Sequence, residues 1–325
     1  MEIVADGIDD ILIKLYPCLL NSGIRNKGKR GDTLEILGVL IRIENPMARI
    51  SRSEDRGKPF SALGELLWYL SGSDRLTFIE RYIDRYKTDA EDDGRLHGAY
   101  GPRLFNMRGK IDQLGNVIQL LRQRPSSKQA VIQLFDAEDL TGDFREIPCT
   151  TTMQFFVRDG RLHLSVTMRS NDGYFGLPHD VFCFTMLQEI VARSLECELG
   201  VYYHYVGSMH VYTDYINNMQ SYIDEGWQRP EIMPSMPKGD PFVEVSKLLK
   251  AESLISNNVQ LNADEEMKSP YWADILRLVQ VFWASGNQTR LDELKKEFHN
   301  EIYRSHLETR RNKKQRFTSN TPGKE

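Results

Sequence analysis

The segment Glu146–Asp180 reads EIPCTTTMQFFVRDGRLHLSVTMRSNDGYFGLPHD, and it decides the fold more than any other part of the chain. Apolar residues alternate on both sides of Asp159-Gly160, which predicts a hairpin of two strands, 153–157 and 162–168. The apolar run 181–195 that follows predicts a long helix packed on those strands. We therefore expect an α+β fold with one large mixed sheet flanked by helices.

The same segment carries three kinds of chemistry at fixed spacing. Cys149 follows a proline at the entrance of the first strand, where its thiol is placed to act as a nucleophile. A free cysteine is more often a small buried apolar residue, but Arg169 favours the thiolate if it lies nearby. Arg169 and Ser170 also suit a phosphate monoester, and Asp180 offers a carboxylate to a base edge. Together they indicate an enzyme that works covalently on a nucleotide.

Outside this segment the periodicity of apolar residues predicts further elements. Leu63, Leu66, Leu67 and Leu70 have helical spacing. The expected helices are 7–22, 60–86 and 111–122, and the expected strands are 34–43 and 130–135.

The end of the chain leaves this pattern. A turn-rich linker at 233–241 precedes two helical segments, marked by apolar residues over 275–282 and 291–302, and the basic stretch 304–316 is interpreted as a solvated face. The expected division is a catalytic domain (1–236), a C-terminal helical extension packed on the same domain (237–312) and a disordered tail (313–325).

Composition limits the class of protein. The chain has 325 residues, 40% of them hydrophobic, and no apolar run of about 18 residues that would span a membrane. Its start, Met1–Asp6, is acidic and unlike a signal peptide, and its four cysteines lack disulfide or metal spacing. We expect a cytoplasmic protein without a metal. The net charge of −4 argues against general binding of nucleic acid.

The motifs and their order resemble the thymidylate synthase superfamily. Pro148-Cys149 precedes an Arg-Ser-x-Asp motif, which starts 20 residues after the cysteine and is followed by Gly-x-Pro. Three more stretches match the family: the GELLWYL helix around Glu65, the Tyr100-Gly101 turn and His210-x-Tyr212. The likeness covers roughly residues 25–225.

The resemblance implies a reaction and a donor. Cys149 would add to carbon 6 of a pyrimidine nucleotide, and carbon 5 would then take a one-carbon unit from 5,10-methylenetetrahydrofolate. Glu65 would organise the catalytic water and proton transfers, with a pKa raised by burial, and Tyr100 would belong to the catalytic group. The resemblance also implies a homodimer formed through the sheet face.

Substrate and folate ligands follow from the same motifs. Arg169, Ser170, His210 and Tyr212 would hold phosphate and sugar, and Asp172, Tyr86 and Gly176 would contact the folate. Arg30 is the preferred phosphate ligand of the N-terminal loop, with Arg25 as runner-up. The pair of arginines that a partner subunit lends in synthases falls on Lys128-Gln129, and Arg124 is the candidate to compensate for the lost charge.

Departures from the family pattern indicate a different substrate. Synthases that act on dUMP have an asparagine where this chain has Asp180. An ionised carboxylate only accepts hydrogen bonds, which suits the amino group of cytosine and repels the carbonyl of uracil. One proton shared between Asp180 and ring nitrogen 3 would remove the remaining clash, so Asp180 has two expected roles, base recognition and proton relay.

Two further departures concern the product. Tyr86 stands where synthases place a tryptophan beside the folate, and at 318–325 we expect the apolar C-terminal lid of synthases to be missing or replaced. Both changes favour attack of water on the carbon 5 methylene over hydride transfer. The leading hypothesis is 5-hydroxymethylation of CMP or dCMP. A methylating synthase acting on dUMP or dCMP, and a catalytically silent nucleotide-binding protein, are the alternatives.

Overall fold

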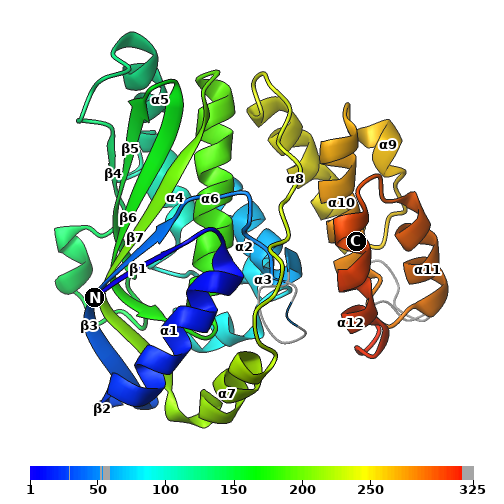
Figure 1. Ribbon diagram of the computed structural model, residues 1–325. Helices are drawn as coiled ribbons and strands as arrows, with labels where there is room; N and C mark the ends of the chain where they lie inside the picture. Colours follow the sequence, from blue (N-terminus) through cyan, green and yellow to red (C-terminus); the bar gives the residue numbers. More distant parts are fainter. Residues whose placement is uncertain (29, 52, 54–58, 317–325) are drawn as a thin grey trace.

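A mixed seven-stranded sheet forms one side of the protein in the computed structural model, which describes residues 1–28, 30–51, 53 and 59–316 (Figure 1). The strands lie in the order β1-β3-β7-β6-β5-β4, and β2 pairs with β3. Two neighbour pairs are parallel, β1 with β3 and β6 with β7, whereas the other pairs are antiparallel. The α+β class is thereby confirmed. The strands are β1 (Glu2–Ala5), β2 (Ile24–Gly28), β3 (Gly31–Ile43), β4 (Val131–Gln133), β5 (Thr150–Arg158), β6 (Arg161–Asp172) and β7 (Glu198–Tyr212).

The hairpin expected from the central segment is present as β5 and β6. Arg158 lies opposite Arg161, and the two turn residues between them both have positive φ, 50° at Asp159 and 70° at Gly160. Such a turn matches the twist of paired strands and needs a residue tolerant of the left-handed region. Because β6 also pairs with β7, Asp172 lies opposite His210, at the end of the sheet where the candidate site lies.

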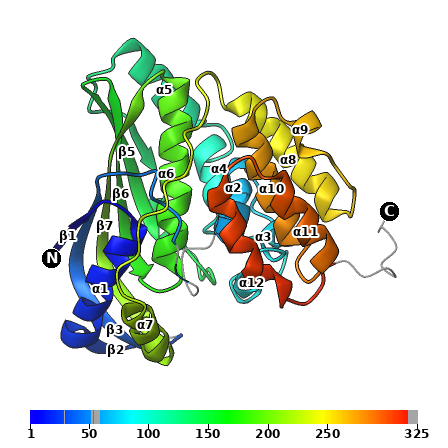
Figure 2. The same ribbon diagram turned by 45° about the vertical axis from the view of Figure 1, so that its right-hand side comes forward.

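Helix α6 (Gly176–Ser194) packs on β6 and β7, and α2 (Pro59–Leu70) packs on α6 (Figure 2). Nearly every side chain of α6 is buried because the sheet covers one flank and α2 another. The other helices of this part are α1 (Ile8–Ser22), α3 (Leu76–Ile79), α4 (Tyr100–Phe105), α5 (Gln113–Gln123) and α7 (Ile216–Asp224).

The single helix expected over 60–86 is wrong. Helix α2 ends at Leu70, and Gly72 has a φ of 68°, which no continuing helix allows. The hydroxyl of Ser71 donates to the carbonyl of Trp68 and accepts from the Ser73 N–H, so local hydrogen bonds stabilise the turn. The chain then doubles back through α3 and a 3-10 helix, η1 (Asp84–Thr88), which carries Tyr86 to α2.

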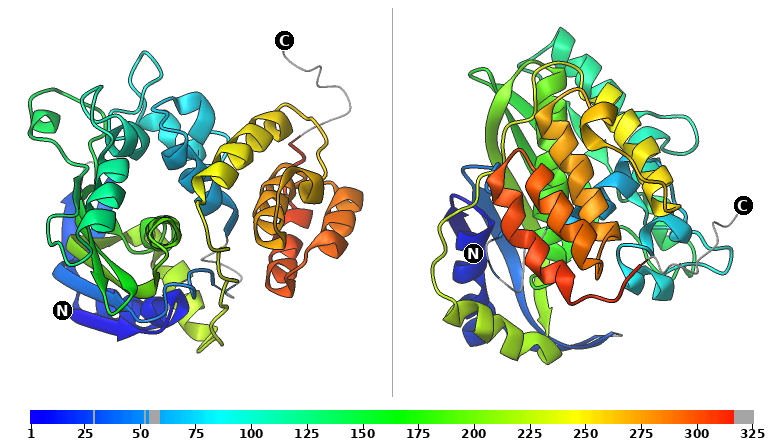
Figure 3. Two further views of the ribbon diagram at one scale, coloured as in Figure 1. Left: turned by 90° about the horizontal axis from the view of Figure 1, so that it is seen from above. Right: turned by 90° about the vertical axis from the view of Figure 1, so that its right-hand side faces the viewer.

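After α7, the described part of the chain forms five more α-helices, which stand beside the sheet domain (Figure 3). α10 is buried along its length, against α2 on one side and α8 on another. α8 was not expected from the sequence, and the division at 236/237 stays a prediction. Most of the predicted tail, 317–325, lies outside the described residues. The elements are α8 (Phe242–Ser256), α9 (Ala263–Glu266), α10 (Pro270–Trp283), α11 (Gln288–Glu297), the 3-10 helix η4 (Glu301–Leu307) and α12 (Glu308–Arg311).

The basic end of the chain is not wholly a solvated face. The guanidinium of Arg310 lies 4.3 Å from the ring centre of Phe60, and that of Arg316 lies 3.8 Å from the ring centre of Phe282. Cations at this distance are attracted to the ring face, which explains why two charges pack inward. They tie the end of the chain to α2 and α10. Over the residues described, no helix has the length and apolarity to cross a membrane.

Candidate active site

The expected nucleophile lies at the entrance of β5, beside the C-terminal part of β6. The N–H of Arg169 donates to the carbonyl of Cys149 (2.8 Å), and its guanidinium donates to the carbonyls of Pro148 (2.9 Å) and Ile147 (3.0 Å). The same guanidinium lies 3.6 Å from the Cys149 sulfur. Arg169 therefore fixes the loop that presents the thiol.

The charge state of Cys149 differs from the expected thiolate. Burial raises its pKa to about 11, with Glu146 and Asp180 adding to the rise, although Arg169 and Arg30 act in the opposite direction. The arginines lower the pKa of Cys149, as predicted, but burial raises it more. Removing a thiolate from water costs more free energy than the attraction of the guanidinium groups supplies. The resting protein thus carries a protonated thiol.

Tyr100, at the start of α4, supports the residue next to the nucleophile. Its hydroxyl oxygen accepts from the N–H (3.1 Å) and the hydroxyl (2.9 Å) of Thr150. Burial raises the pKa of Tyr100 well above its ordinary value, and Cys149 and Asp180 contribute to the shift. Tyr100 is thereby a neutral phenol in electrostatic reach of both groups.

Glu65 lies in the middle of α2 and accepts three hydrogen bonds. The hydroxyls of Tyr69 (3.0 Å) and Tyr86 (2.6 Å) reach Oε1, and Nδ1 of His179 lies 2.9 Å from Oε2. Burial alone would raise the pKa of Glu65, but the hydrogen bonds and the charge of His179 outweigh it and the pKa is lowered. The expectation of a raised pKa is wrong, because these donors stabilise the ionised form.

Asp180 lies in the first turn of α6, and its surroundings have the opposite effect. Burial raises its pKa well above the ordinary value, and the negative charges of Glu65 and Asp172 raise it further. The amide of Asn171, 2.7 Å from Oδ2, only partly compensates. These surroundings favour the protonated carboxyl, which fits the expected role of holding a proton better than that of an ionised acceptor.

The residues expected to bind phosphate and sugar gather at the ends of β6 and β7. The hydroxyl of Ser170 lies 3.4 Å from Nδ1 of His210, and the rings of His210 and Tyr212 lie 5.5 Å apart. Arg30 forms an ion pair with Asp89 (2.5 Å) and lowers the pKa of both Cys149 and Glu146. This position favours Arg30 over Arg25, which lies exposed on β2.

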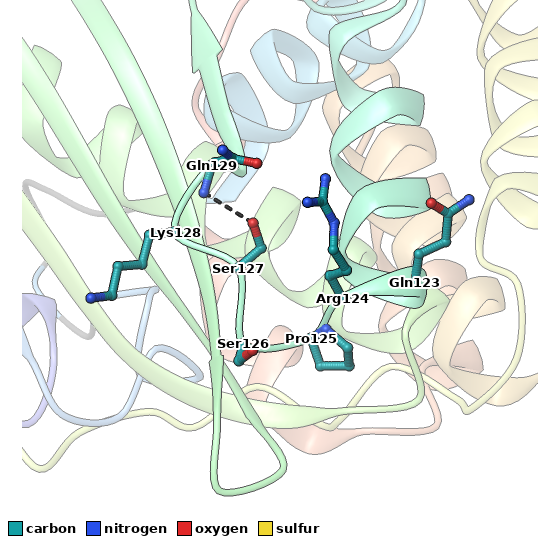
Figure 4. Close-up of a pocket in the computed structure, with 7 residues that line it drawn as sticks. All are labelled: Gln123, Arg124, Pro125, Ser126, Ser127, Lys128 and Gln129. Carbon is teal, nitrogen blue, oxygen red and sulfur yellow. Dashed lines mark hydrogen bonds between the residues drawn. The ribbon is translucent and has the colours of Figure 1, made fainter.

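Lys128 does not join this cluster within its own chain. Its carbonyl accepts from the Gln154 amide (2.8 Å), five residues along β5 from Cys149 and about 16 Å away on an extended strand. The side chains of Arg124 and Lys128 point in different directions from their loop, 123–129, which lines an open hollow (Figure 4). A contribution of Lys128 to a partner subunit stays a prediction.

Three further residues of the cluster were not anticipated. His179 pairs with Glu65, and its Nε2 lies 3.1 Å from the Ser61 hydroxyl. Glu146 lies against Gly98, and burial and the charge of Asp89 raise its pKa to about 7. Arg85 lies over the Tyr212 ring, 5.8 Å from its centre. His179 immediately precedes Asp180, and Glu146 stands three positions before Cys149, which is the one signal that the sequence offered.

A folate site is supported by an unsatisfied carboxylate oxygen. Oδ1 of Asp172 accepts from the N–H groups of Tyr174 (2.8 Å) and Phe175 (3.2 Å). Oδ2 is buried and accepts no hydrogen bond from any residue that the structure describes. A buried acceptor without a donor is costly, so a ligand with ring N–H groups, such as a pterin, suits this position.

Comparison with known proteins places this cluster in a family. The profile of the thymidylate synthase family matches residues 22–240, and the chain belongs to this family. Its members are one-carbon transferases that act on a pyrimidine nucleotide and use 5,10-methylenetetrahydrofolate as the donor.

The relatives that resemble the chain carry the names of two different enzymes. Thymidylate synthase 1 of Bacillus spizizenii is 30% identical over 213 residues, 63% of this chain and 76% of the relative. The thymidylate synthase of Bacillus mojavensis is 29% identical over 239 residues, 71% of this chain and 83% of the relative. The deoxyuridylate hydroxymethyltransferase of Pseudomonas phage M6 is 33% identical over 177 residues, 53% of this chain and 50% of the relative.

Proposed function

We propose that the protein transfers a one-carbon unit to carbon 5 of CMP or dCMP and forms the 5-hydroxymethyl nucleotide. The observation that carries the proposal is the buried Asp180, whose pKa is raised well above its ordinary value. When a thiolate adds to carbon 6 of cytosine, negative charge develops toward nitrogen 3, which carries no proton. A neutral carboxyl supplies that proton, whereas nitrogen 3 of uracil already carries one.

Cys149 is the proposed nucleophile, and its proton must leave before it attacks. The thiol is protonated at rest, and Glu146, with a pKa of about 7, is the neighbour suited to take that proton. Attack then forms the bond from sulfur to carbon 6 while the proton of Asp180 passes to nitrogen 3. Arg169, with Arg30, holds the phosphate and fixes the distance between sulfur and ring.

Water rather than hydride is proposed to complete the reaction. Glu65 is ionised and offers a base to a water molecule, and Tyr86 brings a polar hydroxyl to Glu65 where synthases have a tryptophan. The M6 relative is named for a hydroxymethyl transfer, which supports the same kind of transfer on this fold. 5,10-Methylenetetrahydrofolate supplies the one-carbon unit when bound, and Asp172 would hold its pterin.

Homodimer formation and the sharing of Lys128 between subunits belong to the same proposal. Lys128 lies beside Gln154 in the middle of β5, about 16 Å along the strand from Cys149, so a second copy is the route by which Lys128 would reach a phosphate. A point cation in place of a guanidinium fork would bind that phosphate less rigidly.

A product assay tests the proposal. The protein is incubated with 5,10-methylenetetrahydrofolate and CMP, dCMP, UMP or dUMP, and the nucleotides are analysed by mass spectrometry. We expect addition of CH2O to a cytosine nucleotide, abolished in Cys149→Ala and retained in the matched control Cys197→Ala, which changes a cysteine outside the cluster. A methylated uracil nucleotide, without any modified cytosine nucleotide, would refute the proposal.

Hydroxymethylation of a uracil nucleotide is the second candidate, since the M6 relative is named for deoxyuridylate. The four-nucleotide assay separates the two candidates directly. A methylating synthase would instead release dihydrofolate, and a silent binding protein would fail to release tritium from carbon 5 of a labelled nucleotide.

A further inference from the structure

A line of buried hydrogen bonds leads from the sheet to Asp180. Tyr202 and His204 lie on β7 with the Tyr202 hydroxyl 2.7 Å from Nδ1 of His204. Nε2 of His204 lies 3.0 Å from Oδ1 of Asn171 on β6, and the Asn171 amide lies 2.7 Å from Oδ2 of Asp180. Tyr202 and His204 are fully buried, and Asn171 is 4% exposed. We call these three residues the Asn171 relay.

With the Asn171 amide nitrogen directed toward Asp180, as in the structure, only one set of hydrogen-bond directions satisfies the relay. Burial lowers the pKa of His204 to about 3, so its ring is neutral and carries a single N–H. The Asn171 amide donates to Asp180, which turns the Asn171 carbonyl toward His204 and places the ring N–H on Nε2. Nδ1 then accepts from the Tyr202 hydroxyl. Each of the three hydrogen bonds thus joins one donor to one acceptor.

This direction decides where a neutral Asp180 carries its proton. Oδ2 accepts from Asn171, and a hydroxyl at that oxygen would turn its own hydrogen toward the amide hydrogens. The proton therefore belongs on Oδ1. The carboxyl becomes an ordered pair, with a donor at Oδ1 and an acceptor at Oδ2.

Cytosine and uracil require opposite arrangements of the donor and the acceptor on the carboxyl group. Nitrogen 3 of cytosine accepts and its amino group donates, whereas nitrogen 3 of uracil donates and its carbonyl accepts. A carboxyl whose proton could move to either oxygen would match both bases. A carboxyl whose proton is fixed matches one of them and leaves the other with two unsatisfied contacts, which costs affinity.

We propose that the Asn171 relay positions the proton of Asp180. By keeping Oδ2 of Asp180 a hydrogen-bond acceptor, the relay sets the choice between cytosine and uracil. The inference rests on the proposed function for the statement that cytosine is the favoured base. Under it, Oδ1 faces nitrogen 3 and Oδ2 faces the amino group. Asp180 touches the base, and Asn171, His204 and Tyr202 act through Asp180.

Gly176 offers an independent way to disturb the relay. A Cβ at this position would lie 2.8 Å from the Asn171 amide nitrogen and 3.6 Å from Oδ2 of Asp180. The amide is held by bonds on both sides, so an added methyl group has to displace it. Gly176→Ala should therefore act on base choice as Asn171→Ala does, without deleting any polar group.

Competition between equal concentrations of CMP and UMP, with 5,10-methylenetetrahydrofolate, tests the inference through the ratio of the two products. We expect this ratio to fall about tenfold in Asn171→Ala, the equivalent of one hydrogen bond, and less in Tyr202→Phe. Gln188→Ala is the matched control, since Gln188 is a buried amide on α6 that donates to the Leu162 carbonyl (2.9 Å) and not to Asp180. It should lower stability and leave the ratio unchanged.

An unchanged ratio in folded Asn171→Ala overturns the inference, and if that variant does not fold, the ratio in Gly176→Ala decides in the same way. The proposed function fails separately: a wild-type protein that prefers UMP refutes the cytosine assignment. In that case the relay is still supported if the variants reduce the preference for UMP, since a fixed proton would then be selecting the other edge.

Discussion

Glu65 on α2 and Asp180 on α6 are both buried carboxyls, 6% and 8% exposed, yet their pKa values move in opposite directions. Glu65 accepts from two tyrosine hydroxyls and from His179. Asp180 accepts from one neutral amide and faces the charge of Glu65. Burial is the same for both, so the number and charge of the donors decide which carboxyl is ionised.

The difference in pKa suits the two carboxyl groups to two different chemical roles. An ionised carboxylate is a base for water, and a neutral carboxyl is a source of a proton for a ring nitrogen. Glu65 also reinforces the difference, because its negative charge raises the pKa of Asp180. A substitution at either carboxyl should remove this difference in charge state.

The largest effect is expected for Glu65→Gln. The amide keeps the shape and can still accept from Tyr69 and Tyr86, but it cannot take a proton from water. We expect kcat for the hydroxymethylated product to fall by roughly 10²–10⁴. Steady-state assay of the product by mass spectrometry measures it.

Glu252→Gln is the matched control for this change. Glu252 is also a buried glutamate that accepts from a tyrosine hydroxyl, that of Tyr82 (2.7 Å), but it lies on α8. Its substitution should leave kcat within about twofold. Equal losses of kcat in both variants would show that Glu65 matters for packing alone.

The next largest effect is expected for Asp180→Asn with a cytosine nucleotide. The amide oxygen can accept from Asn171 as Oδ2 does, and the NH2 group can still donate to nitrogen 3. It does not give up its proton, so kcat should fall by roughly 10²-fold while the Kd for CMP changes little. Calorimetric titration and turnover assays separate the two constants, and a lost affinity with an unchanged kcat contradicts the proton-relay role.

The sequence was sufficient for the parts of the fold that local patterns determine. The β5-β6 hairpin followed from alternation around Asp159-Gly160, and α6 followed from an apolar run too long for a strand. The reversal at Gly72 was missed because apolar spacing continues in register beyond the turn-type cluster at 71–74, and the φ of 68° at Gly72 shows the turn. That one glycine determines whether Tyr86 returns to Glu65.

Residue types at the site were predictable, and their charge states were not. Motif spacing identified Cys149, Glu65 and Asp180, whereas the direction of each pKa depends on partners far away in sequence. His179 is 114 positions from Glu65, and Asn171 meets His204 across 33 positions. Arg169 does lower the pKa of Cys149, but the cost of burial is larger and is visible only once the neighbours are placed.

A smaller effect is expected for His179→Gln, which keeps a donor beside Glu65 and removes the charge. His179 helps to lower the pKa of Glu65, so that pKa should rise in the variant. The ionised form is the active one, and the acid limb of the kcat profile should therefore move to higher pH, with a several-fold loss of activity on that limb. His163→Ala changes a histidine outside the cluster, bonded to the Val201 N–H, and should leave the limb in place.

The smallest effect concerns stability, and it should have opposite signs at the two carboxyls. A raised pKa means that folded Asp180 keeps its proton while the unfolded chain has released it, so its contribution is lost as pH rises above about 4. Asp180→Asn, which needs no proton, should therefore gain stability relative to wild type as pH rises from about 5 to about 7.5. Glu65 has a lowered pKa and contributes stability that is lost as pH falls below about 4.5, so Glu65→Gln should lose stability relative to wild type as pH rises from about 3 to about 5. Urea unfolding across each pH range measures the two differences, and changes of equal sign would refute the opposite charge states.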